Sequence, residues 1–346
     1  MFEGRRVDES SHTPNVHWMD GFVESSKKAT KLNMLLGTND VLPVEESDIL
    51  VCMSQLEPGS INQLKLRHPN LKTILVLFET SLGARYTYNP RNHQEFDAVV
   101  TYNSRLIDHQ RYFPLPPRAY YRHRIVSGMP FSQRKVGCLV GTNRPMVYRS
   151  GIFTMKKGWH FSWKDWADYI FCPGELITYR SKVGKACAQY PGGIFDIFGE
   201  GWELLEETRN KCLGIPKVSV LQYAGNYRYY MAFENHTGEH SLISERIWDA
   251  LWGDSVPVYY GNKRLHQYIP RECFVDASNF GSPREMLEWL TNAPEEVWER
   301  YRKAGRDFIH SAQVERFLPE AFAEAFLRPI LKFALVASSE NGVNRT

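Results

Sequence analysis

The chain has 346 residues, of which 43% are apolar and 23% charged, and its formal net charge is +3. This length suits two α/β domains of ordinary size, and the composition is that of a folded protein rather than a disordered one. The near balance of 42 Lys and Arg against 39 Asp and Glu argues against a nucleic-acid-binding protein, which concentrates positive charge.

The first 130 residues alternate predicted strands and helices after a polar stretch, residues 1–30, that we expect to be peripheral. Short runs rich in β-branched residues predict strands at 48–54, 72–79 and 96–102, with a helix at 61–67. Strands that alternate with helices indicate a parallel sheet with helices on its faces. Residues 1–130 therefore read as one Rossmann-like domain.

The alternation breaks near Pro114, and a basic, proline-containing stretch runs to about Arg134, which we interpret as a domain boundary. Beyond it, residues 131–313 predict a second α/β domain. Two successive domains of this kind leave a cleft between the carboxyl ends of two sheets, where ligands usually bind. The predicted strands are 135–141, 194–198, 229–233, 256–260 and 273–276, and the predicted helices are about 178–190, 242–253, 283–292 and 295–311.

The last predicted helix, residues 314–337, has an apolar face that includes Phe317, Phe322 and Phe326. Such a face can make peripheral contact with a membrane surface. A helix that closes the core or the domain interface is the favoured interpretation, because amphipathic helices of soluble proteins commonly do this.

Residues 229–251 form the most informative segment, which reads as a strand, a glycine-containing loop and a helix. Ser241 and Ser244 can cap that helix, whose N-terminus would offer unpaired N–H groups and a positive dipole to a diphosphate. Arg246 would add a bidentate phosphate donor, and Glu245 could accept hydrogen bonds from ribose hydroxyls. By itself this pattern favours an ordinary capped helix with surface charges.

The same segment resembles the donor-binding signature of glycosyltransferase family 10, the α-1,3/1,4-fucosyltransferases. Two features depart from the family pattern: Arg246 replaces a lysine, and Leu242 stands where an aromatic residue is usual, in a loop one residue longer. The resemblance runs in order over about residues 75–330, and its N-terminal blocks are similar to those of bacterial members. The matching blocks are Phe78-Glu79, Asn89–Asn92, Phe96–Tyr102, Arg180 with Asp196–Trp202, Tyr227-Arg-Tyr229, Phe233-Glu-Asn235, Ile243-Ser-Glu-Arg246 and Val256–Gly261.

The resemblance implies a GT-B fold, in which two Rossmann-like domains face each other across a cleft. The N-terminal domain would bind an oligosaccharide or glycan acceptor, and the C-terminal domain a GDP-sugar donor. The implied reaction is inverting transfer of L-fucose from GDP-fucose to an acceptor hydroxyl. Because no Asp-x-Asp string occurs, we expect no metal-clamped diphosphate and no tightly bound cofactor, with Mg²⁺ or Mn²⁺ as stimulating ions at most.

Inverting transfer needs a base for the acceptor proton and stabilisation of the leaving nucleoside diphosphate. The resemblance assigns the base to Glu79, which would otherwise be an exposed loop residue, and Glu95 or Asp97 is the fallback. Arg180 would stabilise the leaving group, unless it is a surface residue of an amphipathic helix. Arg246 and the helix N-terminus near Ser244 would act with Arg180, and Asn235 and Glu245 would contact the nucleotide or ribose.

Three alternatives stay open at this point. The string His236-x-x-Glu239-His240 fits an inverted zinc peptidase, but Gly238 disfavours the helix that this site requires. A relative with a different nucleotide-sugar donor is the second alternative. A relative that binds a nucleotide or sugar without catalysis is the third, and the replacements at Arg246 and Leu242 are compatible with either.

Several features bear on the compartment. The six cysteines have no Cys-x-x-Cys spacing, which favours free thiols in a reducing compartment over a zinc ribbon or disulfide framework. No run approaches the ~18 apolar residues that span a bilayer, and the polar N-terminus lacks a signal-peptide apolar region. A glycan on the sequon Asn235-His-Thr237 would block the expected donor site. We therefore expect a cytoplasmic protein, although a chain trimmed of a membrane anchor would read the same way.

Overall fold

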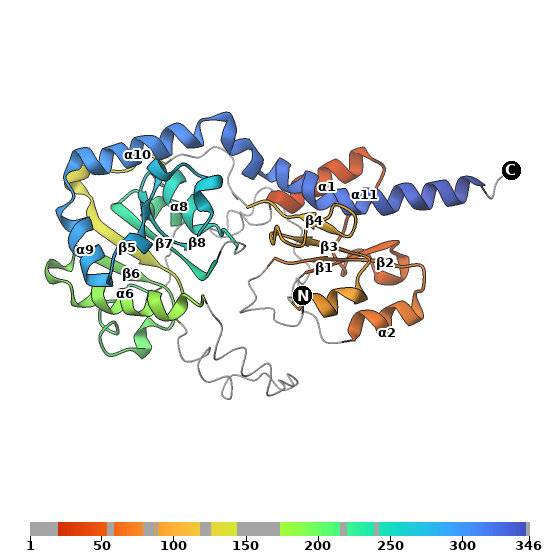
Figure 1. Cartoon of the computed structure of the whole chain (residues 1–346), viewed down its shortest axis with the longest axis horizontal. Helices are drawn as coiled ribbons and strands as arrows, with labels where there is room; N and C mark the ends of the chain where they lie inside the picture. The colour runs from red at the N-terminus through yellow and green to blue at the C-terminus, as the bar shows by residue number, and fades with distance from the viewer. Residues whose placement is uncertain are drawn as a thin grey trace. The chain divides into compact units, whose positions relative to one another are not determined.

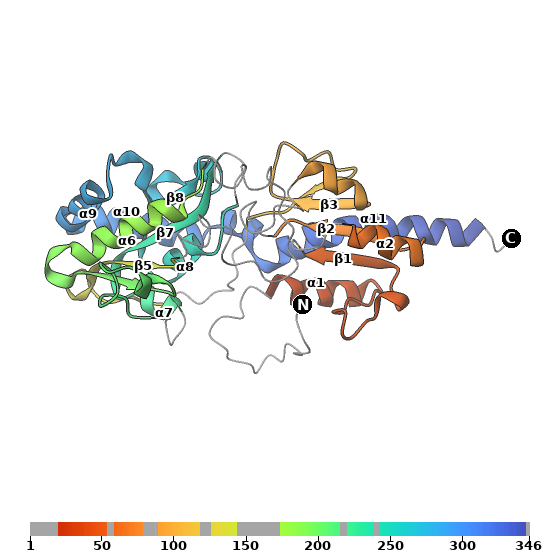
Figure 2. The ribbon, with the colours of Figure 1, turned by 90° about the horizontal axis from the view of Figure 1, so that it is seen from below.

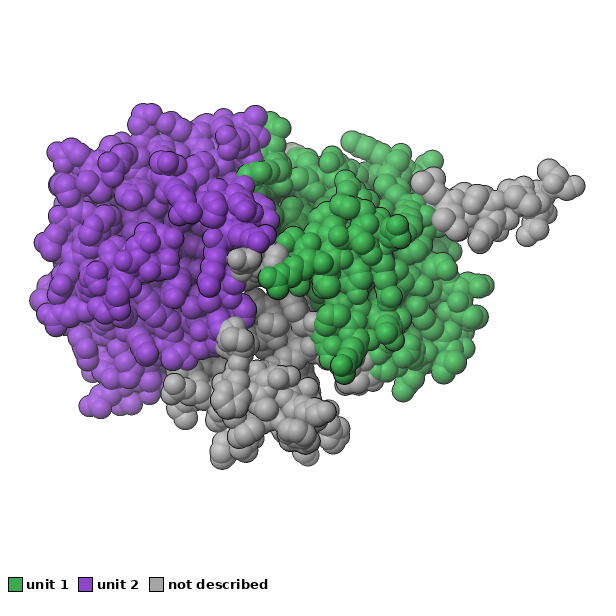
Figure 3. All heavy atoms as spheres, in the orientation of Figure 1, with its two compact units in different colours: residues 1–122, 315–346 green, residues 123–314 purple. Residues whose placement is uncertain are grey.

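The computed structural model describes residues 20–53, 59–78, 87, 89–117, 126–143, 174–214, 220–238 and 242–343. The chain divides into two units (Figures 1 and 3). Unit 1 combines residues 1–122 with residues 315–346, and unit 2 comprises residues 123–314. The first unit is therefore built from both ends of the sequence, and the division falls at Arg122, within the basic stretch interpreted as a boundary.

Unit 1 contains a four-stranded parallel sheet in the order β1-β2-β3-β4. Its inner strands are fully buried beyond their first residues, which explains why their sequences are continuous apolar runs rather than alternating ones. Three of these strands and the intervening helix were predicted, whereas the short β4 was not. The elements are β1 (Ile49–Met53), α2 (Ser60–Arg67), β2 (Lys72–Val76), β3 (Ala98–Thr101) and β4 (Tyr112–Pro114).

Two helices from opposite ends of the chain pack together in unit 1, α1 (Asp20–Lys31) and α11 (Pro319–Val343), as Figures 1 and 2 both show. Phe22 of α1 lies between Phe322 and Phe326 of α11, with ring centroids 5.1 and 5.4 Å away. These rings share one core with strands β2, β3 and β4. The apolar face of the last helix is thus buried inside unit 1, so it is core rather than a membrane-contacting surface.

Unit 2 contains a five-stranded sheet in the order β6-β5-β7-β8-β9, and every pairing is parallel. The central strand, β7, is buried from Tyr229 to Glu234. The strands are β5 (Lys135–Val140), β6 (Phe195–Phe198), β7 (Tyr227–Gly238), β8 (Val256–Asn262) and β9 (Val275–Asp276). The helices are α6 (Ile177–Gln189), α7 (Val220–Ala224), α8 (Arg246–Trp252), α9 (Pro283–Asn292) and α10 (Glu295–Ile309).

Two parallel-sheet α/β units confirm the fold class predicted from the sequence, that of the two Rossmann-like domains of GT-B proteins. Two local predictions in unit 2 were wrong. β7 does not end at Phe233 but continues to Gly238 after a register shift, and the following helix begins at Arg246 rather than near residue 242. Among the described residues, no helix is both long and apolar enough to cross a membrane.

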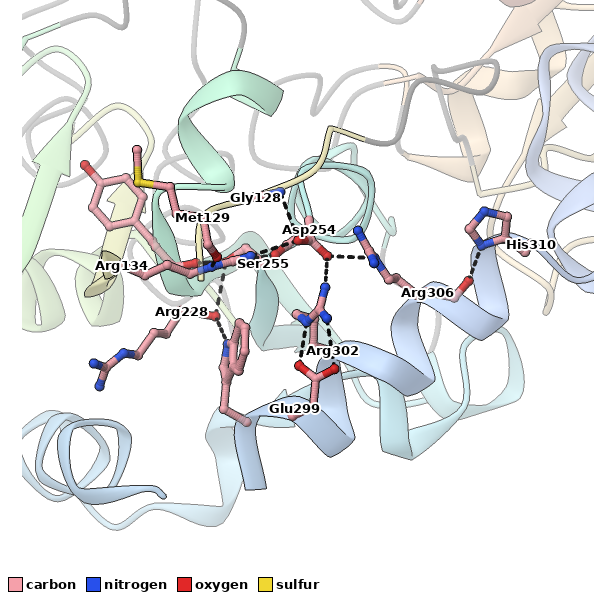
Figure 4. A network of polar contacts seen from close by, with 12 residues as sticks. Gly128, Met129, Arg134, Arg228, Asp254, Ser255, Glu299, Arg302, Arg306 and His310 are labelled. Atoms are coloured by element: carbon pink, nitrogen blue, oxygen red, sulfur yellow. Dashed lines mark hydrogen bonds and ion pairs between the residues drawn. The ribbon is translucent and has the colours of Figure 1, made fainter. Parts of the chain in front are cut away.

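A buried ion-pair network ties three parts of unit 2 together around Asp254, which lies between α8 and β8 (Figure 4). Its carboxylate contacts Arg134 Nη2 at 2.8 Å, and the two side chains are each only 1% exposed. Arg302 Nη1 and Arg306 Nε of α10 lie 2.7 and 2.9 Å from the same carboxylate. The backbone N–H of Gly128 also donates to it at 3.0 Å. The network therefore joins the segment that precedes β5, the α8–β8 turn and α10.

Candidate functional site

The carboxyl end of β7 is the natural place for a ligand in unit 2, because ligands of parallel α/β sheets bind outside the carboxyl ends of the strands. Successive residues of a strand point to opposite faces of the sheet. Glu234 contacts the segment that leads into α8, whereas its neighbour Asn235 contacts α6. The end of β7 thus places two adjacent polar side chains against helices on opposite faces.

On one face, Arg180 of α6 bridges two strand ends. Its Nη1 donates to Asn235 Oδ1 at 3.0 Å, and its Nη2 donates to the carbonyl of Thr142, after β5, at 3.0 Å. The residue is 4% exposed, so it is not on the surface of an amphipathic helix. The backbone N–H of Leu176 donates to the Asn235 carbonyl at 2.9 Å, which holds the start of α6 against β7. Arg180 and Asn235 are therefore brought together as the sequence predicted for one site.

The turns after β5 and β6 pack tightly beside Arg180. Gly201 has φ +84°, and a Cβ atom there would overlap the carbonyl oxygen of Asn143. The N–H of Asn143 donates to the carbonyl of Glu200 at 2.8 Å, so the two turns hold each other. Trp202 Nε1 donates to the Gly141 carbonyl at 2.8 Å. These contacts require a glycine at position 201 and fix the turn that receives the Arg180 guanidinium.

On the other face, Glu234 organises the residues between β7 and α8. Its Oε1 accepts the backbone N–H of Ser244 at 2.8 Å, and its Oε2 lies 3.6 Å from Arg246 Nη1. Arg246 Nη1 also donates to Ser244 Oγ at 2.9 Å and lies 3.8 Å from Glu245 Oε1. Ser244, Glu245 and Arg246 are thus placed together beside the end of β7.

Burial and charge act in opposite directions on these groups. Burial raises the pKa of Glu234 to about 6, against the lowering effects of Arg246 and of the Ser244 hydrogen bonds. Burial lowers the pKa of Arg246, but the carboxylates of Glu245 and Glu234 outweigh it, and the net pKa is raised. Arg246 therefore carries its positive charge at every pH at which the protein would be assayed, whereas Glu234 is ionised only above mildly acidic pH.

The predicted cap of α8 is wrong. The helix has seven residues, its N-cap is Glu245, and no side chain caps it. Ser244 Oγ lies 2.9 Å from the Arg246 guanidinium but 3.5 Å from the Arg246 backbone nitrogen. Its hydroxyl therefore accepts its shorter hydrogen bond from the arginine side chain rather than from the helix backbone. Ser241 lies outside the described residues. The positive group that this segment offers is therefore the Arg246 side chain rather than the end of a long helix.

The expected base, Glu79, lies outside the described residues, close after β2, which ends at Val76. The fallback residues Glu95 and Asp97 precede β3 and so lie at the opposite, amino end of that sheet. Asp97 accepts from Lys65 Nζ at 2.9 Å and from the backbone N–H of Thr73 at 2.7 Å, so it is a structural residue. These contacts outweigh burial and lower its pKa.

The zinc-peptidase alternative is wrong. That site needs two histidines on one helix, whereas His236 lies in strand β7 and forms an antiparallel bridge with Glu175. Glu239 and His240 lie outside the described residues. In the described ranges, no group of three or more His, Cys, Asp or Glu residues could hold a metal ion.

Glu234 was not predicted as a site residue from the sequence, although it lies within the matching block Phe233-Glu-Asn235. The residue is 3% exposed near the carboxyl end of the central strand, and buried acidic side chains are rare unless they are paired. An acid at the end of an apolar strand, with an arginine a short loop later, was the available signal. Tyr259, whose hydroxyl lies 3.5 Å from Glu234 Oε1, was likewise not predicted from the sequence.

Comparison with known proteins gives a family match within unit 2. Residues 195–310 match the model of glycosyltransferase family 10 (fucosyltransferase), C-terminal part. Human α-(1,3)-fucosyltransferase 7 is 36% identical over 109 residues, which cover 31% of this chain and 29% of that protein. The gorilla 4-galactosyl-N-acetylglucosaminide 3-α-L-fucosyltransferase FUT5 is 30% identical over 225 residues, covering 59% of this chain and 57% of that protein. The chain thus spans less than two thirds of these relatives.

Solved structures show a similar fold at low identity. Anabaena HepE, solved in complex with UDP, has a TM-score of 0.51 at 10% identity and covers 84% of this chain and 80% of its own. An α1,3-fucosyltransferase has a TM-score of 0.48 at 12% identity, with coverages of 88% and 84%. Likeness at such identity concerns the fold alone.

Proposed function

We propose that this chain, whose residues 195–310 match the model of glycosyltransferase family 10 (fucosyltransferase), C-terminal part, transfers a sugar from a nucleoside-diphosphate donor to a glycan hydroxyl with inversion. The proposed donor is GDP-L-fucose, the acceptor is an oligosaccharide or glycan, and the implied reaction is that of an α-1,3-fucosyltransferase. The names of the curated relatives support fucosyl transfer, since each refers to a fucosyltransferase.

The observation that carries this proposal is the pair of arginines at the carboxyl end of β7. Arg180 and Arg246 come from helices on opposite faces of the sheet, and each contacts one of the adjacent residues Asn235 and Glu234. Arg246 keeps 18% of its side chain exposed. Preorganised guanidinium groups stabilise the charge that develops on a leaving diphosphate, because they need no rearrangement during the reaction.

In the proposed mechanism, a carboxylate takes the proton of the acceptor hydroxyl while the acceptor oxygen attacks the anomeric carbon. The bond between that carbon and the diphosphate breaks, and the nucleoside diphosphate leaves with the bonding electrons. We assign the base to Glu79, which follows the carboxyl end of a parallel strand, where catalytic side chains of such folds are found. Asn235 and Glu245 would contact the nucleotide or ribose.

Calorimetric titration with GDP, UDP, CDP and ADP tests the donor site, followed by a transfer assay with GDP-fucose over a panel of glycan acceptors. We expect selective GDP binding that is weakened about tenfold or more in Arg246→Ala, since a charged hydrogen bond contributes roughly 1.5–3 kcal/mol. Glu79→Ala should keep GDP binding but lose transfer. Stereochemical analysis of the product checks inversion.

The other outcomes separate the alternatives. Selective binding of another nucleotide would replace the proposed donor while keeping the reaction class. Nucleotide binding without transfer to any acceptor would indicate a non-catalytic relative, and no binding at all would refute the donor site. Parallel assays with Mg²⁺, Mn²⁺ and a chelator test the proposal that these ions stimulate the reaction without being tightly bound.

A further inference from the structure

We propose that Glu234 is a positioning residue of the donor site: its buried carboxylate holds the segment from Ser244 to Arg246, and Gly261 leaves the space that this carboxylate needs. The inference rests on the proposed function, because Arg246 is there the cation that faces the donor diphosphate. Glu234 itself is 3% exposed, so its role is to hold Arg246 rather than to touch the sugar.

The carboxylate is held from two neighbouring elements. From the segment before α8, the Ser244 N–H donates to Oε1 at 2.8 Å, and Arg246 Nη1 lies 3.6 Å from Oε2. From β8, the Tyr259 hydroxyl lies 3.5 Å from Oε1 and accepts the Asn262 N–H at 3.0 Å. Because that N–H occupies a lone pair of the hydroxyl, the phenol proton can point to Glu234. Both carboxylate oxygens are thus engaged, which fixes the direction from which Arg246 is held.

Gly261 provides a second, independent observation. A Cβ atom at this position would lie 2.6 Å from the Tyr259 hydroxyl, 2.9 Å from Glu234 Cβ and closer still to Glu234 Cγ. Its backbone does not have the positive φ that selects glycine for conformational reasons. The requirement is therefore steric: any side chain on β8 here pushes Glu234 away from Ser244 and Arg246.

The pairing depends on ionisation of Glu234. The charged or titratable groups that face it are Arg246 and Glu245 from the segment entering α8, and Tyr259 from β8. Burial, the largest influence, raises the pKa of Glu234 to about 6. Acidification through this pH neutralises the carboxylate and removes its attraction for Arg246. Donor affinity should therefore fall as the pH decreases from about 7.5 to 5.

The test compares Glu234→Gln and Gly261→Ala with the wild-type protein. Glutamine keeps the shape and the Ser244 hydrogen bond but not the charge, and alanine displaces an intact Glu234. The first matched control is Glu207→Gln, which neutralises a carboxylate paired with Lys185 at 2.9 Å on the surface of unit 2. The second is Gly281→Ala before α9, where the nearest atom to the added methyl would be Glu285 Oε2, the end of an exposed side chain, at 3.1 Å.

The probe is GDP-fucose, because a diphosphate esterified at both ends has no proton near pH 6, whereas a terminal phosphate titrates there. We expect about a 10- to 100-fold loss of GDP-fucose affinity in Glu234→Gln at pH 7.5, from the loss of a charge-assisted contact. The donor KM should rise while the acceptor KM stays constant. The affinity of wild-type protein should fall on acidification through about pH 6, and that of Glu234→Gln should not. Gly261→Ala should reproduce the donor defect, and both controls should bind as wild type.

Two results would overturn the inference while leaving the proposed function intact. In the first, Glu234→Gln binds GDP-fucose with the same affinity and the same pH profile as the wild-type protein. The other is an equal rise of donor and acceptor KM in Glu234→Gln and Gly261→Ala, which a general loss of structure produces. Failure of the wild-type protein to bind any nucleotide sugar refutes the proposed function and this inference together.

Discussion

Asp254→Asn is the sharpest test of what holds unit 2 together. The substitution changes little except charge: asparagine has nearly the same shape, and it tolerates the positive φ of 60° at this position better than most residues. It leaves the buried Arg134 guanidinium without its carboxylate and removes the group that anchors Arg302 and Arg306 (Figure 4).

Breaking a buried pair by removing one partner costs about 3–5 kcal/mol, because the remaining charge stays buried without compensation. A domain of roughly 150–250 residues loses about 2–4 °C in Tm per kcal/mol, so the expected decrease is about 6–20 °C. Arg134 and Arg302 outweigh burial and hold the pKa of Asp254 below its ordinary value. A carboxylate whose pKa is lower in the folded protein than in the unfolded chain stabilises the fold at pH values above its unfolded-state pKa. This stabilisation is lost as the pH falls through the folded-state pKa. The difference between wild type and variant should therefore be constant from pH 8 to about 5 and shrink below about pH 4.

Scanning calorimetry measures the loss of stability in Asp254→Asn, and hydrogen exchange shows which strands are destabilised. Amides of β5 and β7 should exchange faster in the variant, while those of β2 in unit 1 serve as an internal reference. The control is Asp307→Asn, which removes an exposed pair with Lys303 and should change stability by at most about 1 kcal/mol. A Tm within about 2 °C of wild type, or a loss undiminished at pH 3, would refute the reasoning.

Three further outcomes follow from the packing. Gly184→Ala would place a methyl carbon far closer than van der Waals contact to a ring carbon of the fully buried Trp202. Such overpacking costs about 1–3 kcal/mol, so calorimetry should show a lower Tm. Because Arg180 lies one helical turn before Gly184, the same variant should also bind GDP more weakly, as titration can show. Phe322→Ala should cost about 3–5 kcal/mol and speed hydrogen exchange in β2 but not in β7. Unchanged Tm values in these variants, or exchange that rises equally in both units, would contradict the packing described.

Most strands of both sheets were predictable because buried parallel strands have a distinctive composition, whereas the three-residue β4 was too short to be recognised. Ile74, Leu75 and Val76 are almost fully buried, and their continuous apolar run is visible without the structure. α1 was not predictable, because most of its residues are polar and its one strong anchor, Phe22, packs against a helix almost 300 residues later. Propensity describes a local segment, whereas this helix is stabilised by a distant one.

The site residues were found as a set, but their relations were not. A family-like order of residues brought Arg180, Asn235 and Arg246 to attention, yet it could not show that adjacent residues of β7 hold the two arginines on opposite faces. The start of α8 was misplaced because Ser241 looks like an N-cap in the sequence, whereas the helix begins at Arg246. Ser244, the other candidate cap, has its hydroxyl engaged by the Arg246 side chain. The capping preference of Ser244 lost to a side-chain contact two residues away.

The discontinuous construction of unit 1 has a consequence for synthesis on the ribosome. Strands β1 to β4 are made first, but α11, which completes their core, follows the whole of unit 2. At about 5–20 residues per second, the nascent sheet waits roughly 10–40 s for its last helix. During that time its apolar surface is available to chaperones or to neighbouring chains. The second domain can therefore fold before the first, and a chain terminated before Pro319 would leave a folded unit 2 attached to an open sheet.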